Sequence, residues 1–275
     1  MDLDDRASHP AGVFLGRPFS LFAKLGVAAQ VAAELRGLSL IRSRSSVATP
    51  LPVGGGLIPL DDGALLVLEA VPEVPRAARS VAHWRSIGLA LAGLHDVADV
   101  TFGLAAFDGF FGPLPQSNVL VPSAVWVDFY AERRLLPNLR AAVDAGTLPP
   151  SLARAVERLV GRQPLLCGPE PRPALLHGDA QQNNFLTTAS SAYVIDPCPY
   201  FGHPEVDLAL LDYFEPVPEA VFDGYRERRG IDPDFPERRE LWRLFAYLAV
   251  IAVDGTSTFG RPFVDRLAAA LTSYR

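Results

Sequence analysis

The chain has 275 residues, of which 49% are hydrophobic and 20% charged, and its formal net charge at pH 7 is -6. These values are typical of a globular protein with ample core material, and they argue against broad binding to nucleic acid or to anionic membranes, which would require a basic surface. We therefore expect a small-molecule partner and no obligate protein partner.

Targeting signals are not evident in the sequence. The segment from Met1 to Asp5 is acidic, and no basic start leads into an apolar run, so we expect a cytoplasmic protein. The apolar run from Leu244 to Val253 is about half as long as the roughly 20 residues that a membrane span needs, and it predicts a buried helix. Cys167 and Cys198 lack metal-ligand spacing, so we expect them to be reduced and structural.

The first strands are predicted over residues 13–24, with a break at Gly16-Arg17-Pro18 that suits a hairpin. Lys24 ends the second strand and is the only lysine among 25 basic residues. Lysine is a compact point charge that can reach phosphate oxygens where the planar fork of arginine does not fit. The alternative is a compositional bias that left one lysine.

A helix is predicted over residues 28–41, where apolar residues recur at helical intervals, and Glu34 lies on it. A lysine at the end of a strand and a glutamate on the following helix can form an ion pair. The alternative for Glu34 is a solvated charge on the helix surface.

Residues 57–60 and 64–71 predict a hairpin around the turn Asp61-Asp62-Gly63, with a buried second strand. We interpret the preceding run Gly54-Gly55-Gly56 as a turn and not as a phosphate loop, because no Lys-Ser/Thr follows it and no helix opens there. Residues 72–79 are rich in Pro, Glu, Arg and Ala and predict a linker.

Helical patterns dominate the remainder of the chain, over residues 80–97, 126–145, 152–159, 218–229 and 237–253. Short apolar segments at residues 174–176 and 192–195 predict a small hairpin that carries a polar motif on its loop. The sequence thus predicts an α+β fold with a strand-rich beginning, residues 1–71, and a helix-rich remainder, residues 72–275.

The polar motif between these two segments has the residue types of a phosphoryl-transfer site. It reads His177-Gly178-Asp179-Ala180-Gln181-Gln182-Asn183-Asn184, and Asp196 follows a second apolar strand. Transfer of phosphate to an alcohol needs alignment and charge neutralisation. Asp179 would orient the hydroxyl, and Asn184 and Asp196 would hold Mg²⁺ through oxygen atoms.

Each part of the motif has a plainer interpretation, because Asp, Asn, Gly and Pro are ordinary turn formers. The joint pattern favours a kinase: an apolar strand runs into His-Gly-Asp, Asn follows at the kinase interval, and a second strand ends in Asp.

The His-Gly-Asp form resembles the aminoglycoside phosphotransferase-like kinases, and the chain as a whole resembles the fructosamine kinase or ketosamine-3-kinase family. The likeness runs from about Phe22 to the C-terminus. Its further motifs are Phe111 to Asn118, Trp126 to Leu135, Tyr200 to Ala209 and Leu241 to Leu248.

The resemblance implies a bilobal protein-kinase-like fold, with an N-lobe of residues 1–71 that binds nucleotide and a C-lobe of residues 72–275. It implies ATP and Mg²⁺ as cofactors and phosphorylation of a sugar hydroxyl, at the third carbon of the sugar part of a ketosamine. By the same resemblance, Lys24 contacts nucleotide phosphates and pairs with Glu34, and backbone groups near Glu69, Ala70 and Val71 hold adenine.

The resemblance also implies roles in the second half of the chain. Asp179 is the catalytic base, Asn184 and Asp196 are the metal ligands, and Asp207 braces the catalytic loop.

The chain departs from the family pattern in three respects. The family has Leu-Trp and a small residue inside the catalytic loop, where this chain has Ala180 to Asn183, so amides that can bond sugar hydroxyls replace an aromatic wall. Only 23 residues precede Lys24, with Gly12 and Gly16 as the nearby glycines, and Glu34 follows Lys24 closely.

Two alternatives remain open from the sequence. The first is an amino-sugar or aminoglycoside phosphotransferase, for which the acidic residues Glu215, Glu219 and Asp223 are a weak indication, an exposed acidic helix start being the plainer interpretation. The second is a non-catalytic nucleotide-binding module, against which stands the presence of Lys24 and of all three motif residues.

Overall fold

The computed structural model describes residues 2–3, 11–16 and 20–274, so Arg17 and Pro18 of the predicted hairpin break lie outside it. The chain divides into two compact units, each assembled from separated segments. The first contains residues 1–97, 177–199 and 214–230, and the second contains residues 98–176, 200–213 and 231–275. The lobe boundary predicted after Val71 stays a prediction.

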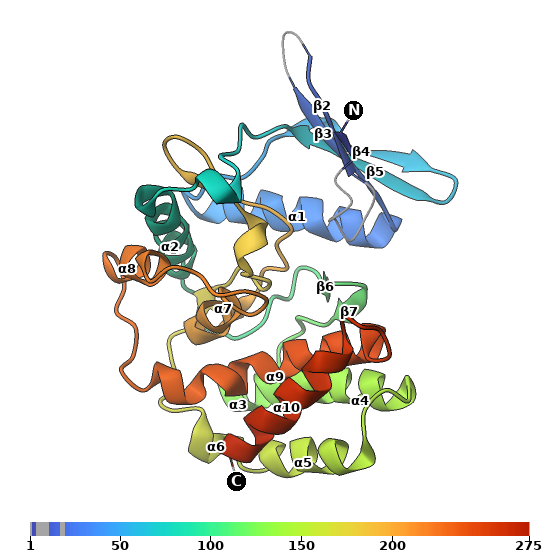
Figure 1. Cartoon of the computed structure of the whole chain (residues 1–275), viewed down its shortest axis with the longest axis vertical. Helices are drawn as coiled ribbons and strands as arrows, with labels where there is room; N and C mark the ends of the chain where they lie inside the picture. The colour runs from blue at the N-terminus through green and yellow to red at the C-terminus, as the bar shows by residue number, and fades with distance from the viewer. Residues whose placement is uncertain (1, 4–10, 17–19, 275) are drawn as a thin grey trace. The chain divides into compact units, whose positions relative to one another are not determined.

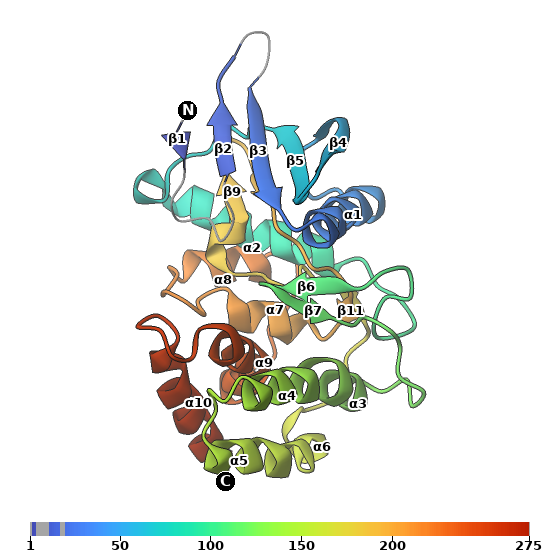
Figure 2. The same cartoon turned by 90° about the vertical axis from the view of Figure 1, so that its right-hand side faces the viewer.

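The first unit contains an antiparallel sheet with the strand order β1-β2-β3-β5-β4 (Figures 1 and 2). Its strands are β1 (Asp2–Leu3), β2 (Ala11–Phe14), β3 (Leu21–Gly26), β4 (Pro52–Leu60) and β5 (Gly63–Glu69). The predicted pairing of the first two strands around residue 16 is confirmed, since Ala11 of β2 lies opposite Lys24 of β3. Lys24 also faces Leu66 of β5.

Helix α1 (Ala28–Arg44) covers one face of this sheet (Figure 1). Val31 and Leu38 of the helix form a buried apolar cluster with Ala64, Leu66 and Leu68 of β5. The helical spacing of apolar residues on α1 and their alternation on β5 therefore produce one core. This core fixes α1 against β5, the strand that pairs with the Lys24 strand, β3.

The three consecutive glycines do not form the turn that we predicted. They lie inside β4, where the pairing with β5 shifts register between Pro52 and Leu57. Gly54 and Gly56 have positive φ angles of 61° and 76°. A strand can absorb such residues as a bulge, so the run interrupts the ladder without ending the strand.

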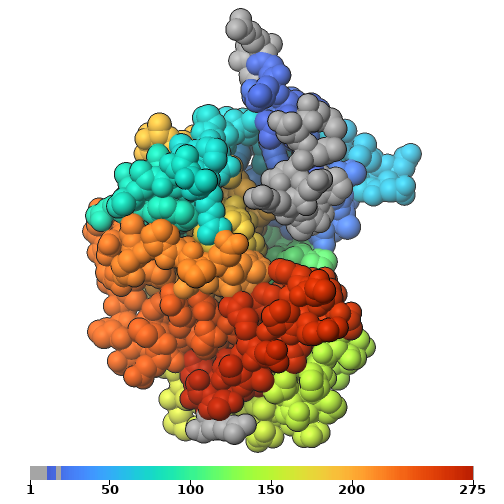
Figure 3. All heavy atoms as spheres, viewed as in Figure 1, coloured from blue at the N-terminus to red at the C-terminus, as the bar shows by residue number. Residues whose placement is uncertain are grey.

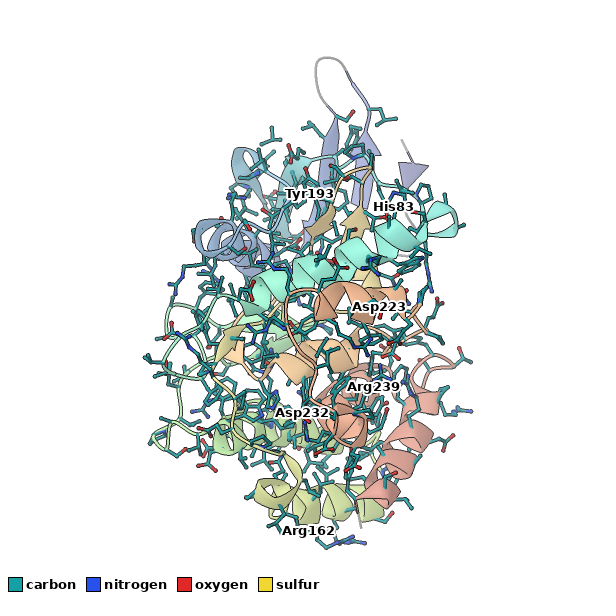
Figure 4. The ribbon with its side chains drawn as sticks, turned by 90° about the vertical axis from the view of Figure 1, so that its left-hand side faces the viewer. His83, Arg162, Tyr193, Asp223, Asp232 and Arg239 are labelled. Carbon is teal, nitrogen blue, oxygen red and sulfur yellow. The ribbon has the colours of Figure 1, made fainter. Side chains whose placement is uncertain are left out.

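Elsewhere in the first unit, helix α2 (Val81–His95) packs against helix α8 (Ala220–Arg226). In Figure 3 the teal surface of α2 adjoins the orange surface of α8. The Ser80 hydroxyl caps α2 by accepting a hydrogen bond from the backbone nitrogen of His83. In turn, Nδ1 of the His83 ring accepts a hydrogen bond from the backbone nitrogen of Ser80. His83 is labelled in Figure 4.

The hairpin predicted from residues 174–176 and 192–195 is wrong. β10 (Ala192–Val194) pairs with β9 (Phe185–Thr187), and β8 (Ala174–Leu175) pairs with β11 (Phe201–Gly202) in the other unit. The reason is loop length: residues 188–191 connect β9 and β10 by a short turn, in which Thr188 N donates to Ser191 O at 2.8 Å, so the local partner costs less loop entropy.

The second unit is mainly helical. Its elements are β6 (Gly109–Phe111), β7 (Leu114–Gln116), α3 (Trp126–Tyr130), α4 (Leu136–Asp144), α5 (Pro150–Val160), α6 (Gln163–Leu166), β8, β11, α7 (Pro204–Leu210), α9 (Phe235–Asp254) and α10 (Arg261–Ser273). A π-helical turn at Ala131–Leu135 joins α3 to α4, so the predicted helix over residues 126–145 is continuous with one local irregularity.

The core of the second unit is rich in aromatic rings. Trp126 of α3 packs against Trp242 of α9 with ring centroids 6.0 Å apart, and Tyr130 meets Trp242 edge-on at 5.2 Å. Glu205 of α7 accepts two hydrogen bonds from Arg238 of α9, at 2.6 and 2.9 Å, and is buried. These contacts tie α3, α7 and α9 together.

Helix α9 confirms the buried helix predicted over residues 237–253. Among the described residues, no helix is both long and apolar enough to cross a bilayer. Helix α10 is not among the predicted helices, although its buried residues Phe263, Leu267, Ala270 and Leu271 have helical spacing.

Candidate active site

Lys24 is buried in the first unit and makes two ion pairs. Its Nζ atom lies 2.8 Å from Oε2 of Glu34 and 2.6 Å from Oδ1 of Asp196. Burial by itself lowers the pKa of Lys24, but the charges of Asp196 and Glu34 outweigh it and the net pKa is raised. The ion pair predicted between Lys24 and Glu34 is confirmed.

Glu34 reaches this position because α1 lies very close to the chain that follows Asp196. Gly37 is one turn further along α1, and a Cβ atom there would lie 2.9 Å from Cδ of Pro199 and 3.0 Å from the carbonyl oxygen of Pro197. A larger residue at position 37 would push the helix away. The glycine therefore allows Glu34 to share Lys24 with Asp196.

The pKa values of the two carboxyl groups beside Lys24 are shifted in opposite directions. Burial, and next the charge of Asp196, raise the pKa of Glu34 well above its usual value. Burial also opposes ionisation of Asp196, but Lys24 more than compensates, and the pKa of Asp196 is lowered. Of the two carboxyl groups, Asp196 therefore gives up its proton more readily than Glu34.

Gly178 allows the catalytic loop, residues 177–184, to pass close to the chain around Cys198. Gly178 has a φ angle of +84°, and a Cβ atom on it would lie only 1.9 Å from the carbonyl oxygen of Cys198. Only glycine fits this position. Glycine at position 178 is therefore required both by the positive φ angle and by the close approach of the loop to Cys198.

His177 fixes the same loop from the other side. Its ring is buried, Nδ1 lies 3.3 Å from the donating backbone nitrogen of Asp179, and Nε2 lies 3.0 Å from the carbonyl oxygen of Ile195. This pattern needs the neutral tautomer that carries its proton on Nε2. His177 therefore joins the strand end before Asp179 to the strand end before Asp196.

Asp179 and Asn184 lie on the same side of the loop, as their spacing predicted. Nδ2 of Asn184 donates to the backbone oxygen of Asp179 at 2.8 Å and to Oδ2 of Asp179 at 3.1 Å. Since the amide nitrogen points to Asp179, the amide oxygen Oδ1 points away from it and can serve as a ligand for a metal ion.

Asn184 and Asp196 are brought together by a backbone contact. The nitrogen of Ile195 donates to the carbonyl oxygen of Asn184 at 3.0 Å. Asp196 follows with a φ of +50°, one of two non-glycine residues with positive φ in the described part of the chain. Such strained conformations concentrate at functional sites.

These residues fit a magnesium ion with bound phosphates. Asn184 offers Oδ1, and the Asp196 side chain is 38% exposed and offers carboxylate oxygens, which are the hard ligands that Mg²⁺ prefers. Among the described residues, no group of three or more His, Cys, Asp or Glu gathers as a metal site. One or two protein oxygens completed by substrate phosphates is the usual arrangement for Mg²⁺ at phosphoryl-transfer sites.

The predicted adenine-binding segment follows β5 in the same unit. Glu69 N donates to Leu51 O at 2.8 Å, and Ala70 N donates to Ser20 O at 3.1 Å. The backbone oxygen of Val71 accepts from Glu73 N at 2.8 Å. The adenine-binding role of Glu69 and Val71 remains a prediction.

Four other acidic residues singled out from the sequence are placed as follows. Asp207 is fully buried in α7, in the second unit, and its bracing role remains a prediction. Glu219 and Asp223 both pair with Arg226, and Glu215 pairs with Arg76. The acidic residues are therefore exposed ion-pair partners, which favours the plainer interpretation of that cluster.

Comparison with known proteins settles the family. A model of the fructosamine kinase family matches residues 17–271. The chain belongs to the fructosamine kinase family. It is 31% identical over 212 residues to "Probable ketoamine kinase YniA" of Escherichia coli strain K12, an alignment that covers 76% of this chain and 71% of the relative.

Solved structures agree with this assignment. A "putative fructosamine-3-kinase" from Thermobifida fusca is 31% identical, with a TM-score of 0.81 over 99% of this chain and 94% of that one. Aminoglycoside phosphotransferase APH(4)-Ia is 17% identical with a TM-score of 0.66, over 100% of this chain and 93% of that one, and shares the fold. The predicted protein-kinase-like α+β fold is confirmed, and family membership implies the use of ATP.

Sequence reasoning missed some residues that shape the site. Gly37 lies against residues far away in the chain, which spacing alone does not reveal, and for Gly178, a residue of the predicted motif, the close contact with Cys198 was not foreseen. Arg79, assigned only to a linker, donates to the carbonyl oxygen of Phe185 directly after Asn184.

Proposed function

We propose that this protein transfers the terminal phosphoryl group of ATP, with Mg²⁺, to a hydroxyl group on the sugar part of a ketosamine. The observation that carries the proposal is the convergence of Lys24, Asp196, Asn184 and Asp179 within one compact unit. Membership of the fructosamine kinase family supports the reaction class, and the E. coli relative is named as a ketoamine kinase.

Asp179 is proposed to orient the acceptor hydroxyl. Its Oδ2 atom accepts from Asn184, which holds the carboxylate in place on the loop, and this carboxylate is the group that would take the acceptor's proton. As the new bond between the acceptor oxygen and the terminal phosphorus forms, the bond from that phosphorus to the bridging oxygen of ATP breaks and ADP leaves. The hydroxyl proton passes to Asp179.

Lys24 is proposed to hold the nucleotide phosphates. An ammonium group has three donors, and two of them face Glu34 and Asp196. The third donor remains for a phosphate oxygen. Bound Mg²⁺ would neutralise phosphate charge, with Oδ1 of Asn184 and the carboxylate of Asp196 as its protein ligands.

The acceptor is proposed to be a small ketosamine. Gln181 is partly exposed and Asn183 is exposed, and both lie between Asp179 and Asn184. Amide side chains donate and accept hydrogen bonds, which suits the several hydroxyls of a sugar. The same property suits an amino sugar, so the acceptor screen must include both classes.

The decisive experiment measures ADP release from MgATP with ketosamines, free amino sugars and aminoglycosides. Asp179→Asn is the matched control, because it keeps the size of the side chain and an oxygen for Asn184 but removes the base. We expect turnover with a ketosamine, and a loss of about 10²–10⁴-fold in kcat in the variant. The proposal fails if no ketosamine is phosphorylated, or if Asp179→Asn keeps wild-type turnover.

A further inference from the structure

The segment between Val71 and α2 contacts the strand that follows the catalytic loop. Val74 N donates to the carbonyl oxygen of Thr187 at 2.7 Å, and Nη2 of Arg79 donates to the carbonyl oxygen of Phe185 at 2.8 Å. Both acceptors are in β9, which begins directly after Asn184. The linker is therefore attached to the end of the catalytic loop.

Arg79 is the buried part of this attachment. Its side chain is only 3% exposed, its guanidinium lies 5.1 Å from the centre of the Trp84 ring, and Nη2 is 3.0 Å from Oε1 of Glu73. Its Nε atom is buried and has no hydrogen-bond partner among the described residues. A buried guanidinium with an unused donor lowers stability, so stability alone does not explain an arginine at position 79.

The position of Phe185 supplies another reason. On one side of the loop, Ile195 N donates to the backbone oxygen of Asn184. On the other, Arg79 holds the next carbonyl along the chain, that of Phe185, whose ring packs 5.4 Å from the ring of His177. These two carbonyls belong to the successive peptide planes on either side of the Phe185 Cα atom, so holding both restrains the chain directly after Asn184 and limits how far the Asn184 side chain can turn.

We propose that Arg79 is a positioning residue, which keeps Asn184 oriented toward the magnesium site by holding the carbonyl of Phe185. The inference rests on the proposed function, in which Asn184 ligates Mg²⁺. Glu73 forms an ion pair with Arg79, so the segment that follows Val71 also helps to orient the catalytic loop.

Arg76 provides a matched control in the same segment. It pairs with Glu215, whose backbone oxygen accepts from Nε2 of Gln182 in the catalytic loop at 3.0 Å. The Arg76 and Glu215 side chains are 41% and 60% exposed, so solvent and salt screen this pair. Arg76 is thus connected to the same loop only through Glu215, and this exposed ion pair should contribute little to the orientation of the loop.

The kinetic test compares Arg79→Met, Arg79→Lys and Arg76→Met for kcat, for the KM of ATP and for the Mg²⁺ concentration that gives half-maximal activity. We expect Arg79→Met to lower kcat at least tenfold and to raise the half-activating Mg²⁺ concentration several-fold, with the KM of ATP changed less than threefold. Arg79→Lys, which can still donate to Phe185, should recover part of both losses, and Arg76→Met should stay within twofold of wild type. Unchanged Mg²⁺ dependence in Arg79→Met, or an equal effect in Arg76→Met, would overturn the inference.

A measurement without nucleotide separates this inference from the proposed function. Hydrogen exchange followed by mass spectrometry reports on residues 183–196, which include the N–H of Ile195. We expect several-fold faster exchange there in Arg79→Met and no change in Arg76→Met, with α9 of the second unit unchanged in both. Unchanged exchange at residues 183–196 refutes the positioning role, whereas a wild-type protein without turnover refutes only the proposed function.

Discussion

The ammonium group of Lys24 lies 2.6 Å from the carboxylate of Asp196, a residue 172 positions away in the sequence. Glu34 completes the group at 2.8 Å. The residue proposed to bind phosphate and a residue proposed to bind magnesium are thus in direct contact within one compact unit. Each of the following predictions tests one consequence of this arrangement or of the fold around it.

Replacing Lys24 by Arg should not preserve activity. The ammonium group sits between two carboxyl groups in a buried space, and the longer planar guanidinium cannot occupy it without moving Glu34 or Asp196. We expect kcat/KM for ATP to fall at least 100-fold in both Lys24→Arg and Lys24→Met. Steady-state kinetics checks this, and a Lys24→Arg enzyme within tenfold of wild type would contradict it.

Glu34 and Asp196 should respond differently to loss of charge. Burial and the charge of Asp196 raise the pKa of Glu34, so loss of its charge in Glu34→Gln should cost less stability than loss of the charge of Asp196, about 1 kcal/mol or less. Asp196→Asn leaves Lys24 without its ionised partner and should cost about 1–3 kcal/mol, a range reduced for the partial exposure of Asp196. Urea denaturation of both variants gives the comparison.

The pH dependence of the same pair has a defined sign. A raised pKa in the folded state means that the stability from Glu34 is fully present below its unfolded pKa and is lost as the pH rises through the folded value. Glu34→Gln removes this loss, so its stability should fall less than that of wild type between acidic and neutral pH. Parallel curves would show that Glu34 is ionised in the folded protein.

Gly178→Ala should destabilise the protein strongly. The new Cβ would meet the carbonyl oxygen of Cys198 at 1.9 Å, and the residue has a φ of +84°, so backbone strain and overpacking add to at least about 3 kcal/mol. Gly146→Ala is the matched control, because Gly146 has a φ of +68° and nothing within 4 Å of its Cβ position. We expect about 1 kcal/mol for the control in denaturant titrations. Equal losses would contradict the close contact.

Cys167 should limit stability at high pH. Burial raises the pKa of its thiol from 9.0 to about 12, with Arg238 opposing the shift. The stability from this group is therefore complete below about pH 9 and is lost as the pH rises toward 12, by about 4 kcal/mol at most.

Cys167→Ala is the variant that tests this loss. It removes the thiol's share of the decline, while Tyr247 and Tyr274, whose pKa values are raised to about 12, still contribute theirs. Melting temperatures between pH 8 and 11 should fall less steeply in the variant. Identical slopes would place the thiol in a more polar environment.

Parts of the fold that depend on local pattern were predictable from the sequence. The strand that contains Lys24, helix α1 and helix α9 follow from short-range residue patterns, and the structure confirms all three, although β3 continues two residues past Lys24 to Gly26. The pairing of residues 174–176 with 192–195 was wrong because a strand's partner depends on competing loop closures, and β9 was available as a nearer one. The interruption of β4 by three glycines was missed because a bulge and a turn use the same residue.

For this protein, the sequence by itself determined the chemistry: residue types at fixed short intervals placed Asp179 beside Asn184 and indicated phosphoryl transfer, since one loop carries both. Only the tertiary structure decided how Lys24, Glu34 and Asp196 share one site, why Gly37 and Gly178 can have no side chain, and how Arg79 reaches the end of the loop. Those contacts join segments far apart in the chain, and their distances depend on the packing of α1 and β9, which no local pattern encodes.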